Sequence, residues 1–265
     1  MSYQPQSILQ DLISFLKYPD RNITRLPMGI ETFFRLVGVH YIFLIGAIIA
    51  MTGVSYLINL DDLDHSIQDM LNEASPIQFL LMLAVVAPVL EEIIFRFPLR
   101  FRRGSLFLAL CIFTLFVYLV GSAYLAPKHD LYPVEVMQEL ESVGFIPNIS
   151  AIFLATGVFL LGMFGLFLAT LNNRMLDGIG KTVDRLFPYI FYATAMIFGY
   201  VHFTNFSGDM KWFWIPFLII PQFVMGLVMG YSRLRFGMLS NIMLHAVNNL
   251  IPGLVILATA GMGGE

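Results

Sequence analysis

Charged residues are scarce in this chain of 265 residues, since Asp, Glu, Lys and Arg together make up only 12% of it. Soluble domains average about 25%. Hydrophobic residues make up 58%, which leaves too little polar surface to cover the core of a soluble domain. The composition therefore excludes a soluble globular enzyme, a disordered chain and a nucleic-acid-binding protein, and it indicates an integral protein of the lipid bilayer.

Cysteine is nearly absent. The single residue, Cys111, excludes an internal disulfide, and its apolar surroundings are typical of a small hydrophobic packing residue. The net charge of −3 gives no indication of an anionic partner. The first residues lack a positively charged stretch followed by an uninterrupted apolar run, so we expect no cleavable signal peptide.

Long apolar runs are plentiful, and a helix needs about 20 apolar residues to cross the hydrocarbon core of a bilayer. Seven runs qualify: 35–58, 76–97, 104–126, 148–172, 187–205, 212–231 and 237–260. The sixth contains Pro216 and Pro221, which a membrane helix tolerates with a kink. We therefore predict an all-α, polytopic membrane helix bundle with about seven transmembrane helices.

Lys and Arg are distributed unevenly between the spans. Counting Arg35 and Arg96 with the adjoining segments, all but Lys128 and Lys211 lie in the N-terminal segment or in the loops after the second, fourth and sixth spans. Cytoplasmic loops carry the excess of these residues, so the N-terminus is predicted to be cytoplasmic. The composition is compatible with a bacterial plasma membrane.

Two segments are expected. Residues 1–33 form a cytoplasmic N-terminal segment, and residues 34–265 form the transmembrane bundle. Within the first, a short amphipathic helix is predicted at about 6–17. Its apolar side suits a helix that lies on the membrane surface, and it suits equally a helix that packs on the bundle.

Two adjacent carboxylates, Glu91 and Glu92, follow ten uncharged residues of the second span. A charged side chain is costly in the bilayer core and marks a functional site by default. Adjacent helical residues point about 100° apart, so the two carboxylates have different roles. Glu92 lies four residues before Arg96 and can pair with it. The alternative is a helix end with solvated charges.

Two other spans each contribute a histidine. His202 follows Phe198 by four residues, and His245 precedes Asn249 by four, with Asn241 on the same helix face. Either histidine alone is commonly a packing or hydrogen-bonding residue. The conjunction of three spans, each with one acid–base set, predicts one polar site in the inner half of the membrane.

Two polar residues are left outside this site. His40 has no polar partner at helical spacing and is interpreted as structural, and Asn248 is expected to face away from His245.

Three motifs occur in order on predicted membrane helices: Glu-Glu-x-x-x-Arg from Glu91, Phe-x-x-x-His from Phe198, and His-x-x-x-Asn from His245. The combination resembles the CPBP family of intramembrane proteases, which includes CAAX prenyl endopeptidases and bacteriocin-processing enzymes. The resemblance covers about residues 76–260. The stretch 104–186 departs from the compact family core, since it holds two extra spans.

The resemblance implies a glutamate-type endopeptidase. Glu91 and His202 would activate a water for attack on the scissile carbonyl, and His245 and Asn249 would form the oxyanion hole. A carboxylate in a water-poor site is a better base, and donors aimed at a developing negative charge contribute around 3 kcal/mol. The supporting residues would be Glu92, Arg96 and Phe198.

No cofactor is expected. Two Glu and two His can bind zinc, but their spacing matches no compact zinc motif, so a catalytic metal is not favoured. The expected partners are the lipid bilayer and a membrane-associated protein or peptide substrate that is cleaved near the cytoplasmic face; no nucleic acid is expected.

Two other functions stay open. A proton-coupled transporter also carries Glu and His in its spans, although the two halves of this sequence show no repeat. A membrane scaffold or immunity protein of the same fold would cleave nothing, because a fold does not imply a function. Such a protein would have no need of Glu91.

Overall fold

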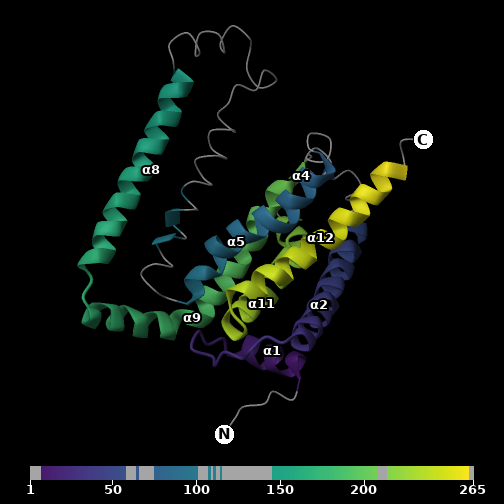
Figure 1. Ribbon diagram of the computed structural model, residues 1–265, viewed down its shortest axis with the longest axis horizontal. Coiled ribbons are helices and arrows are strands. Elements are labelled where there is room, and N and C mark those ends of the chain that lie inside the picture. Colours follow the sequence, from purple (N-terminus) through teal and green to yellow (C-terminus); the bar gives the residue numbers. More distant parts are fainter. Residues whose placement is uncertain are drawn as a thin grey trace. The chain divides into compact units, whose positions relative to one another are not determined.

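The computed structural model describes residues 7–57, 64–65, 75–100, 107–108, 110–111, 114, 145–207 and 214–262. Helices make up nearly all of these residues (Figure 1). The strands among the described residues form one short antiparallel pair, β1 (Asp64–His65) with β2 (Phe206–Ser207). The all-α prediction is confirmed.

The chain divides into two compact units, one formed by Met1–Arg100 with Lys181–Glu265 and the other by Phe101–Gly180. The second unit contains α8 (Phe145–Thr170) and the start of α9 (Asn173–Val201). The first unit contains the rest of α9 and the following elements: α1 (Ile8–Lys17), α2 (Ile30–Leu57), α4 (Pro76–Leu81), η1 (Met82–Val86), α5 (Ala87–Phe95), η2 (Phe97–Leu99), η3 (His202–Asn205), α10 (Ile215–Leu218), α11 (Ile220–Arg235) and α12 (Met238–Met262).

Three helical segments among the described residues are long and apolar enough to cross a membrane: Ile30–Val54, Pro76–Leu99 and Met238–Thr259. They coincide with the first, second and seventh predicted spans. Ala155–Thr170 and α9 meet the criteria together, but they are bent by 108° at the break between them. The described part of the chain therefore holds three or four candidate spans, and most of the third predicted span, 104–126, lies outside it.

The sixth predicted span is interrupted. Pro216 lies in the first turn of α10 and Pro221 in the first turn of α11, so each proline starts a helix. Ile219 separates the two helices. The fifth predicted span, 187–205, belongs to a longer helix than predicted. This helix, α9, begins at Asn173 and includes Pro188 in its interior.

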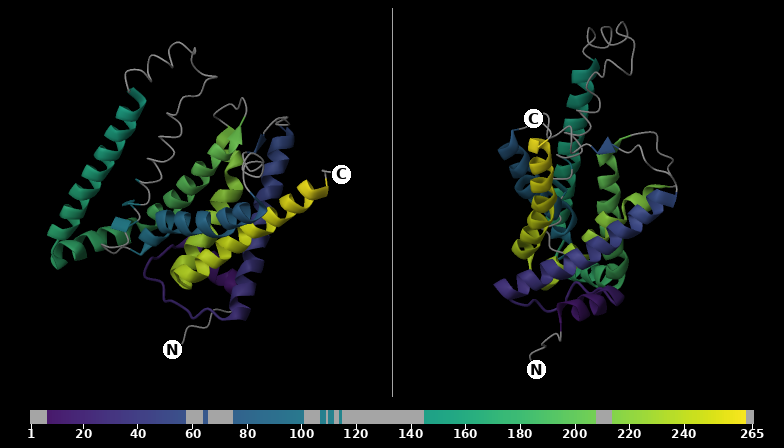
Figure 2. Two further views of the ribbon diagram at one scale, coloured as in Figure 1. Left: turned by 45° about the horizontal axis from the view of Figure 1, so that its top comes forward. Right: turned by 90° about the vertical axis from the view of Figure 1, so that its right-hand side faces the viewer.

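The first unit is built around α11, which packs against α1, α2 and α12, while α12 packs against η1 and α5 (Figures 1 and 2). Two close approaches occur at glycines. An added Cβ on Gly226 of α11 would lie 3.2 Å from Ala195 of α9, and one on Gly253 of α12 would lie 2.5 Å from Leu83 of η1. The turn between α11 and α12 uses Gly237, whose φ of 110° favours glycine. These glycines let the helices that carry the polar residues lie side by side.

The N-terminal helix α1 packs on the bundle. Ser7 caps it by accepting a hydrogen bond from the backbone N–H of Gln10. Its residues Leu12 and Phe15 are buried, and the ring of Phe15 lies 5.1 Å from that of Phe191 in α9. Leu9 and Ile13 on the opposite side are exposed. Contact of Leu9 and Ile13 with the membrane surface stays a prediction.

Candidate active site

The second span changes helix type directly before the two carboxylates. The backbone N–H of Ala87 donates to the carbonyl of Met82, which is the i→i−5 bond of a π-helix. The next bond of this type would run from residue 88 to the carbonyl of Leu83, but Pro88 has no N–H. The side chain of Asn249 donates to this carbonyl instead, at 3.0 Å. Such π-turns occur frequently at functional sites.

Glu92 is fully buried, which excludes the alternative of a solvated helix end for this residue. Its Oε1 lies 2.8 Å from Nδ1 of His245 and 3.4 Å from Nη1 of Arg96, and its Oε2 accepts a hydrogen bond from Nδ2 of Asn241. The Arg96 guanidinium lies 3.7 Å from the centroid of the Phe198 ring, a cation–π contact. The predicted Glu92–Arg96 pair is confirmed. It contacts residues of two other helices, α9 and α12.

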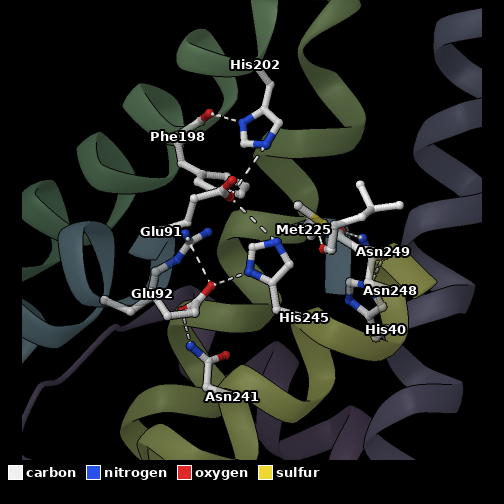
Figure 3. A network of polar contacts seen from close by, with 12 residues as sticks. His40, Glu91, Glu92, Phe198, His202, Met225, Asn241, His245, Asn248 and Asn249 are labelled. Atoms are coloured by element: carbon white, nitrogen blue, oxygen red, sulfur yellow. Dashed lines mark hydrogen bonds and ion pairs between the residues drawn. The ribbon is translucent and has the colours of Figure 1, made fainter. Parts of the chain in front are cut away.

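Glu91 points away from this pair, as its neighbouring position on the helix requires. Its Oε2 lies 3.6 Å from Nε2 of His202 and 3.6 Å from Nε2 of His245 (Figure 3). The Glu91 side chain is 25% exposed, whereas that of Glu92 is 0% exposed. The structure therefore brings Glu91, His202 and His245 together from three helical segments.

Both imidazole rings are oriented by their Nδ1 atoms. Nδ1 of His202 lies 2.8 Å from the backbone carbonyl of Phe198, and Nδ1 of His245 lies 2.8 Å from Oε1 of Glu92. A carbonyl or a carboxylate only accepts hydrogen bonds, so each Nδ1 carries its proton and each Nε2 is turned toward Glu91. The separations of 3.6 Å exceed a direct hydrogen bond, and among the described residues Oε2 of Glu91 and Nε2 of His245 are both buried without a hydrogen-bond partner.

His202 lies at the start of η3, directly after α9 ends at Val201. Its ring lies 4.4 Å from that of Phe198, centroid to centroid. The spacing of four residues places Phe198 where its ring contacts Arg96, His202 and His245 and its carbonyl orients His202. Phe198 thus contacts three residues of the site at once.

Asn249 lies in a second polar group. Its Nδ2 donates to the carbonyl of Leu83, and its Oδ1 accepts from Nδ2 of Asn248 at 3.0 Å. Oδ1 of Asn248 lies 2.8 Å from Nε2 of His40. In the described part of the chain no hydrogen bond joins Asn249 to Glu91 or His245. The expectations for His40 and Asn248 missed this contact, because residues 208 positions apart have no local spacing that could link them.

The described residues contain no group of three or more His, Cys, Asp or Glu side chains placed so that they could hold a metal ion.

All seven predicted site residues lie in the first unit. The stretch that departs from the compact family core, 104–186, nearly coincides with the second unit, Phe101–Gly180. The model of the type II CAAX prenyl endopeptidase Rce1-like family matches residues 73–251, more than half of the chain.

This chain belongs to that family. The predicted resemblance to CPBP intramembrane proteases is confirmed, and the chain is a membrane protein of a CAAX-type protease family, a family of hydrolases. All the predicted site residues, from Glu91 to Asn249, fall within the matched range. The comparisons with curated proteins and with solved structures gave no match.

Proposed function

We propose that this member of the Rce1-like family is a glutamate-type endopeptidase that hydrolyses a peptide bond of a membrane-associated protein or peptide near the cytoplasmic face. The observation that carries the proposal is the position of Glu91. Its Oε2 lies 3.6 Å from the Nε2 atoms of His202 and His245, and Glu91 is the more exposed of the two carboxylates. We therefore assign Glu91 as the reacting carboxylate, while Glu92 holds the site together.

The charges of Glu91, Glu92 and Arg96 support one additional proton bound within the site. Glu91 and Glu92 carry two negative charges and Arg96 carries one positive charge, so one further proton makes this largely buried group neutral. We place that proton on His245, because its Nδ1 faces Glu92 and its Nε2 faces Glu91. His202 has a backbone carbonyl at Nδ1 and stays neutral.

In the first step, a water between Glu91 and His202 attacks the carbonyl carbon of the scissile peptide bond. Glu91 takes one proton from the water, and neutral Nε2 of His202 accepts a hydrogen bond from the other. A C–O bond forms and the carbonyl oxygen becomes an oxyanion. In the second step, the C–N bond breaks, and the leaving amine takes the proton from Glu91. The products are a carboxylic acid and an amine, and Glu91 returns to its starting state.

Two donors are proposed for the oxyanion, Nε2–H of His245 and the N–H of Asn249 that is not bonded to Leu83. An amide nitrogen carries two protons, and only one of them is used by the Leu83 carbonyl. Preorganised donors of this kind stabilise the transition state more than the substrate, because the negative charge develops only during the reaction.

No cofactor is proposed. His245 supplies a positive charge next to the attacked carbonyl, which is the role a Lewis acid would otherwise fill. A chelator should therefore leave cleavage unchanged, and added zinc should not increase it. Loss of cleavage after dialysis against EDTA, with recovery on addition of zinc, would contradict this part of the proposal.

The orientation proposed from the sequence has the N-terminus in the cytoplasm and seven membrane-spanning segments, in a bacterial plasma membrane. Arginine side chains gather where α1 meets the end of α11: Arg235 contacts Asp11, and Arg100 donates to the carbonyl of Leu234. Such an arginine-rich end favours the cytoplasmic side.

The decisive experiment compares protein termini in host membranes that contain either the wild-type protein or the Glu91→Gln variant at equal level. New termini that appear only with the wild type would establish proteolysis and identify the substrate. Identical termini, together with a phenotype of the variant, would overturn the protease proposal and favour a transporter or a scaffold or immunity protein.

A purified assay complements the first experiment. The probe is an internally quenched peptide that ends in a farnesylated cysteine followed by Val-Ile-Met, because the matched family is described by its CAAX prenyl endopeptidases. Cleavage of this peptide, but not of its unprenylated form, would show that the substrate is a prenylated C-terminus. Equal cleavage of both would assign a substrate that needs no prenyl group.

A further inference from the structure

A series of hydrogen bonds links three helical segments, α2, α12 and η1, and ends at the carbonyl of Leu83. His40 of α2 is 1% exposed, and its Nε2 lies 2.8 Å from Oδ1 of Asn248 in α12. Nδ2 of Asn248 donates to Oδ1 of Asn249 at 3.0 Å, and also contacts the sulfur of Met225. Nδ2 of Asn249 donates to the carbonyl of Leu83 in the π-turn. Figure 3 shows this group beside the Glu91 site.

The donor and the acceptor of every hydrogen bond in this series follow from its last acceptor, the carbonyl of Leu83. The carbonyl of Leu83 only accepts, so the amide nitrogen of Asn249 must face it. Oδ1 of Asn249 then faces Asn248 and needs a donor, which is Nδ2 of Asn248. This leaves Oδ1 of Asn248 facing His40, so Nε2 of His40 must carry a proton.

The carbonyl at the end of this series accepts its hydrogen bond because of Pro88. The π-turn would pair the Leu83 carbonyl with the N–H of residue 88, and proline has none. A buried carbonyl without a partner is unfavourable, so the amide of Asn249 is held there. The same proline precedes Glu91 by three residues, which ties the orientation of Asn249 to the helix that carries the proposed base.

We infer that His40 and Asn248 are positioning residues of the active site, which fix the carboxamide of Asn249 so that its second N–H faces the reacting carbonyl oxygen. The effect of these residues on catalysis rests on the proposed function. The amide of an asparagine presents an oxygen or a nitrogen at similar positions, and the oxygen would repel a developing oxyanion. Two hydrogen bonds, one at each end of the amide, prevent this flip.

The first experiment tests the bond direction without any activity measurement. The full-length protein, labelled with ¹⁵N-histidine and purified in detergent, is examined by NMR, and the His40 signals are assigned by their loss in His40→Gln. We expect Nε2 of His40 to be protonated and Nδ1 to be unprotonated. A His40 ring protonated only at Nδ1 would reverse the series and overturn the inference, whether or not the protein is a protease.

The second experiment measures cleavage of the probe peptide by two variants of similar size. His40→Gln keeps a donor for Asn248, and His40→Phe removes it. We expect His40→Phe to lower kcat by about tenfold or more with KM nearly unchanged, and His40→Gln to restore most of the rate. Equal loss in both variants, or wild-type kcat in a folded His40→Phe protein, would overturn the inference.

A double-variant comparison separates positioning from general destabilisation. In an Asn249→Ala background the carboxamide is absent, so His40→Phe should cause no further loss of kcat. The same fold-loss in both backgrounds would show that His40 acts elsewhere and would overturn the inference. If the wild type cleaves nothing while the NMR result holds, the proposed function fails and the bond direction stands.

Discussion

Two buried ionic groups in the first unit differ in how completely their carboxylates are bonded. Asp11 accepts hydrogen bonds on both oxygens: Oδ1 from Nη2 of Arg235, and Oδ2 from Nε of Arg235 and from the hydroxyl of Tyr231, each at 2.7 Å. Oε2 of Glu91 is buried and has no hydrogen-bond partner among the described residues. Its nearest polar neighbours are the two Nε2 atoms at 3.6 Å.

The difference separates a structural ion pair from the proposed reactive site. A carboxylate whose oxygens are all bonded, in the bidentate geometry of Arg235, gains stability and has no capacity left for a substrate. A carboxylate that faces two imidazoles beyond direct bonding distance can accept a proton from an oxygen placed between them. Glu92 belongs with Asp11 in this respect, and Glu91 does not.

The largest expected effect is loss of cleavage on changing Glu91. Glu91→Gln should abolish activity in the purified assay, and His202→Ala and His245→Ala should do the same, because each removes a partner of the attacking water or the oxyanion. All three proteins should insert like the wild type, and Glu91→Gln should also unfold like it. Glu31→Gln, the same change at an exposed residue of α2, is the matched control. Full activity of Glu91→Gln would show that the mechanism is wrong.

The Asp11 group should respond in the opposite way. Asp11→Ala leaves Arg235 without its buried carboxylate and should cost about 3–5 kcal/mol of unfolding free energy. The rate per folded molecule should stay near that of the wild type, since Asp11 is bonded to Tyr231 and Arg235, which are not among the proposed site residues. Thermal unfolding in detergent and the specific activity of the folded fraction measure the two effects. A lower specific activity at normal stability would erase the distinction between the groups.

Removal of the proposed oxyanion donor should leave a trace of activity. Asn249→Ala should lower kcat by about 10²–10³-fold, the usual loss for one such donor. Asn172→Ala, which changes an exposed asparagine that caps a helix, serves as the control for general effects. An Asn249→Ala protein with wild-type kcat would show that Asn249 only supports the π-turn.

The smallest effect is expected for Arg96. In Arg96→Ala, Glu92 keeps its contacts with His245 and Asn241, so the unfolding free energy should fall by only about 1–3 kcal/mol. The amount of folded protein should fall more than the rate per folded molecule. Normal folding of this variant would remove the structural role assigned to the Glu92–Arg96 pair.

Contacts within one helix were predictable from the sequence. The spacing of four residues predicted the pair of Glu92 with Arg96, now found at 3.4 Å, and the shared face of Phe198 and His202, whose ring nitrogen and carbonyl lie 2.8 Å apart. Helical geometry repeats every 3.6 residues, so such contacts depend on local sequence alone.

Contacts between helices were not predictable in the same way. Glu92 meets His245 across 153 positions of the chain, and His40 meets Asn248 across 208. The interruption at Ile219 also escaped prediction, because a proline kinks a helix in one context and starts a new helix in another. Which outcome occurs depends on packing.

The sequence by itself determined that the chain is an all-helical membrane protein and which residue types form its polar site. Sparse charge and long apolar runs force backbone groups to bond within helices, because the bilayer offers no other partners. Only the tertiary structure showed that Glu92 is enclosed by bonded partners while one oxygen of Glu91 has none among the described residues. That distinction depends on which helix faces each oxygen, and helix packing alone brings His202 and His245 to the same atom of Glu91.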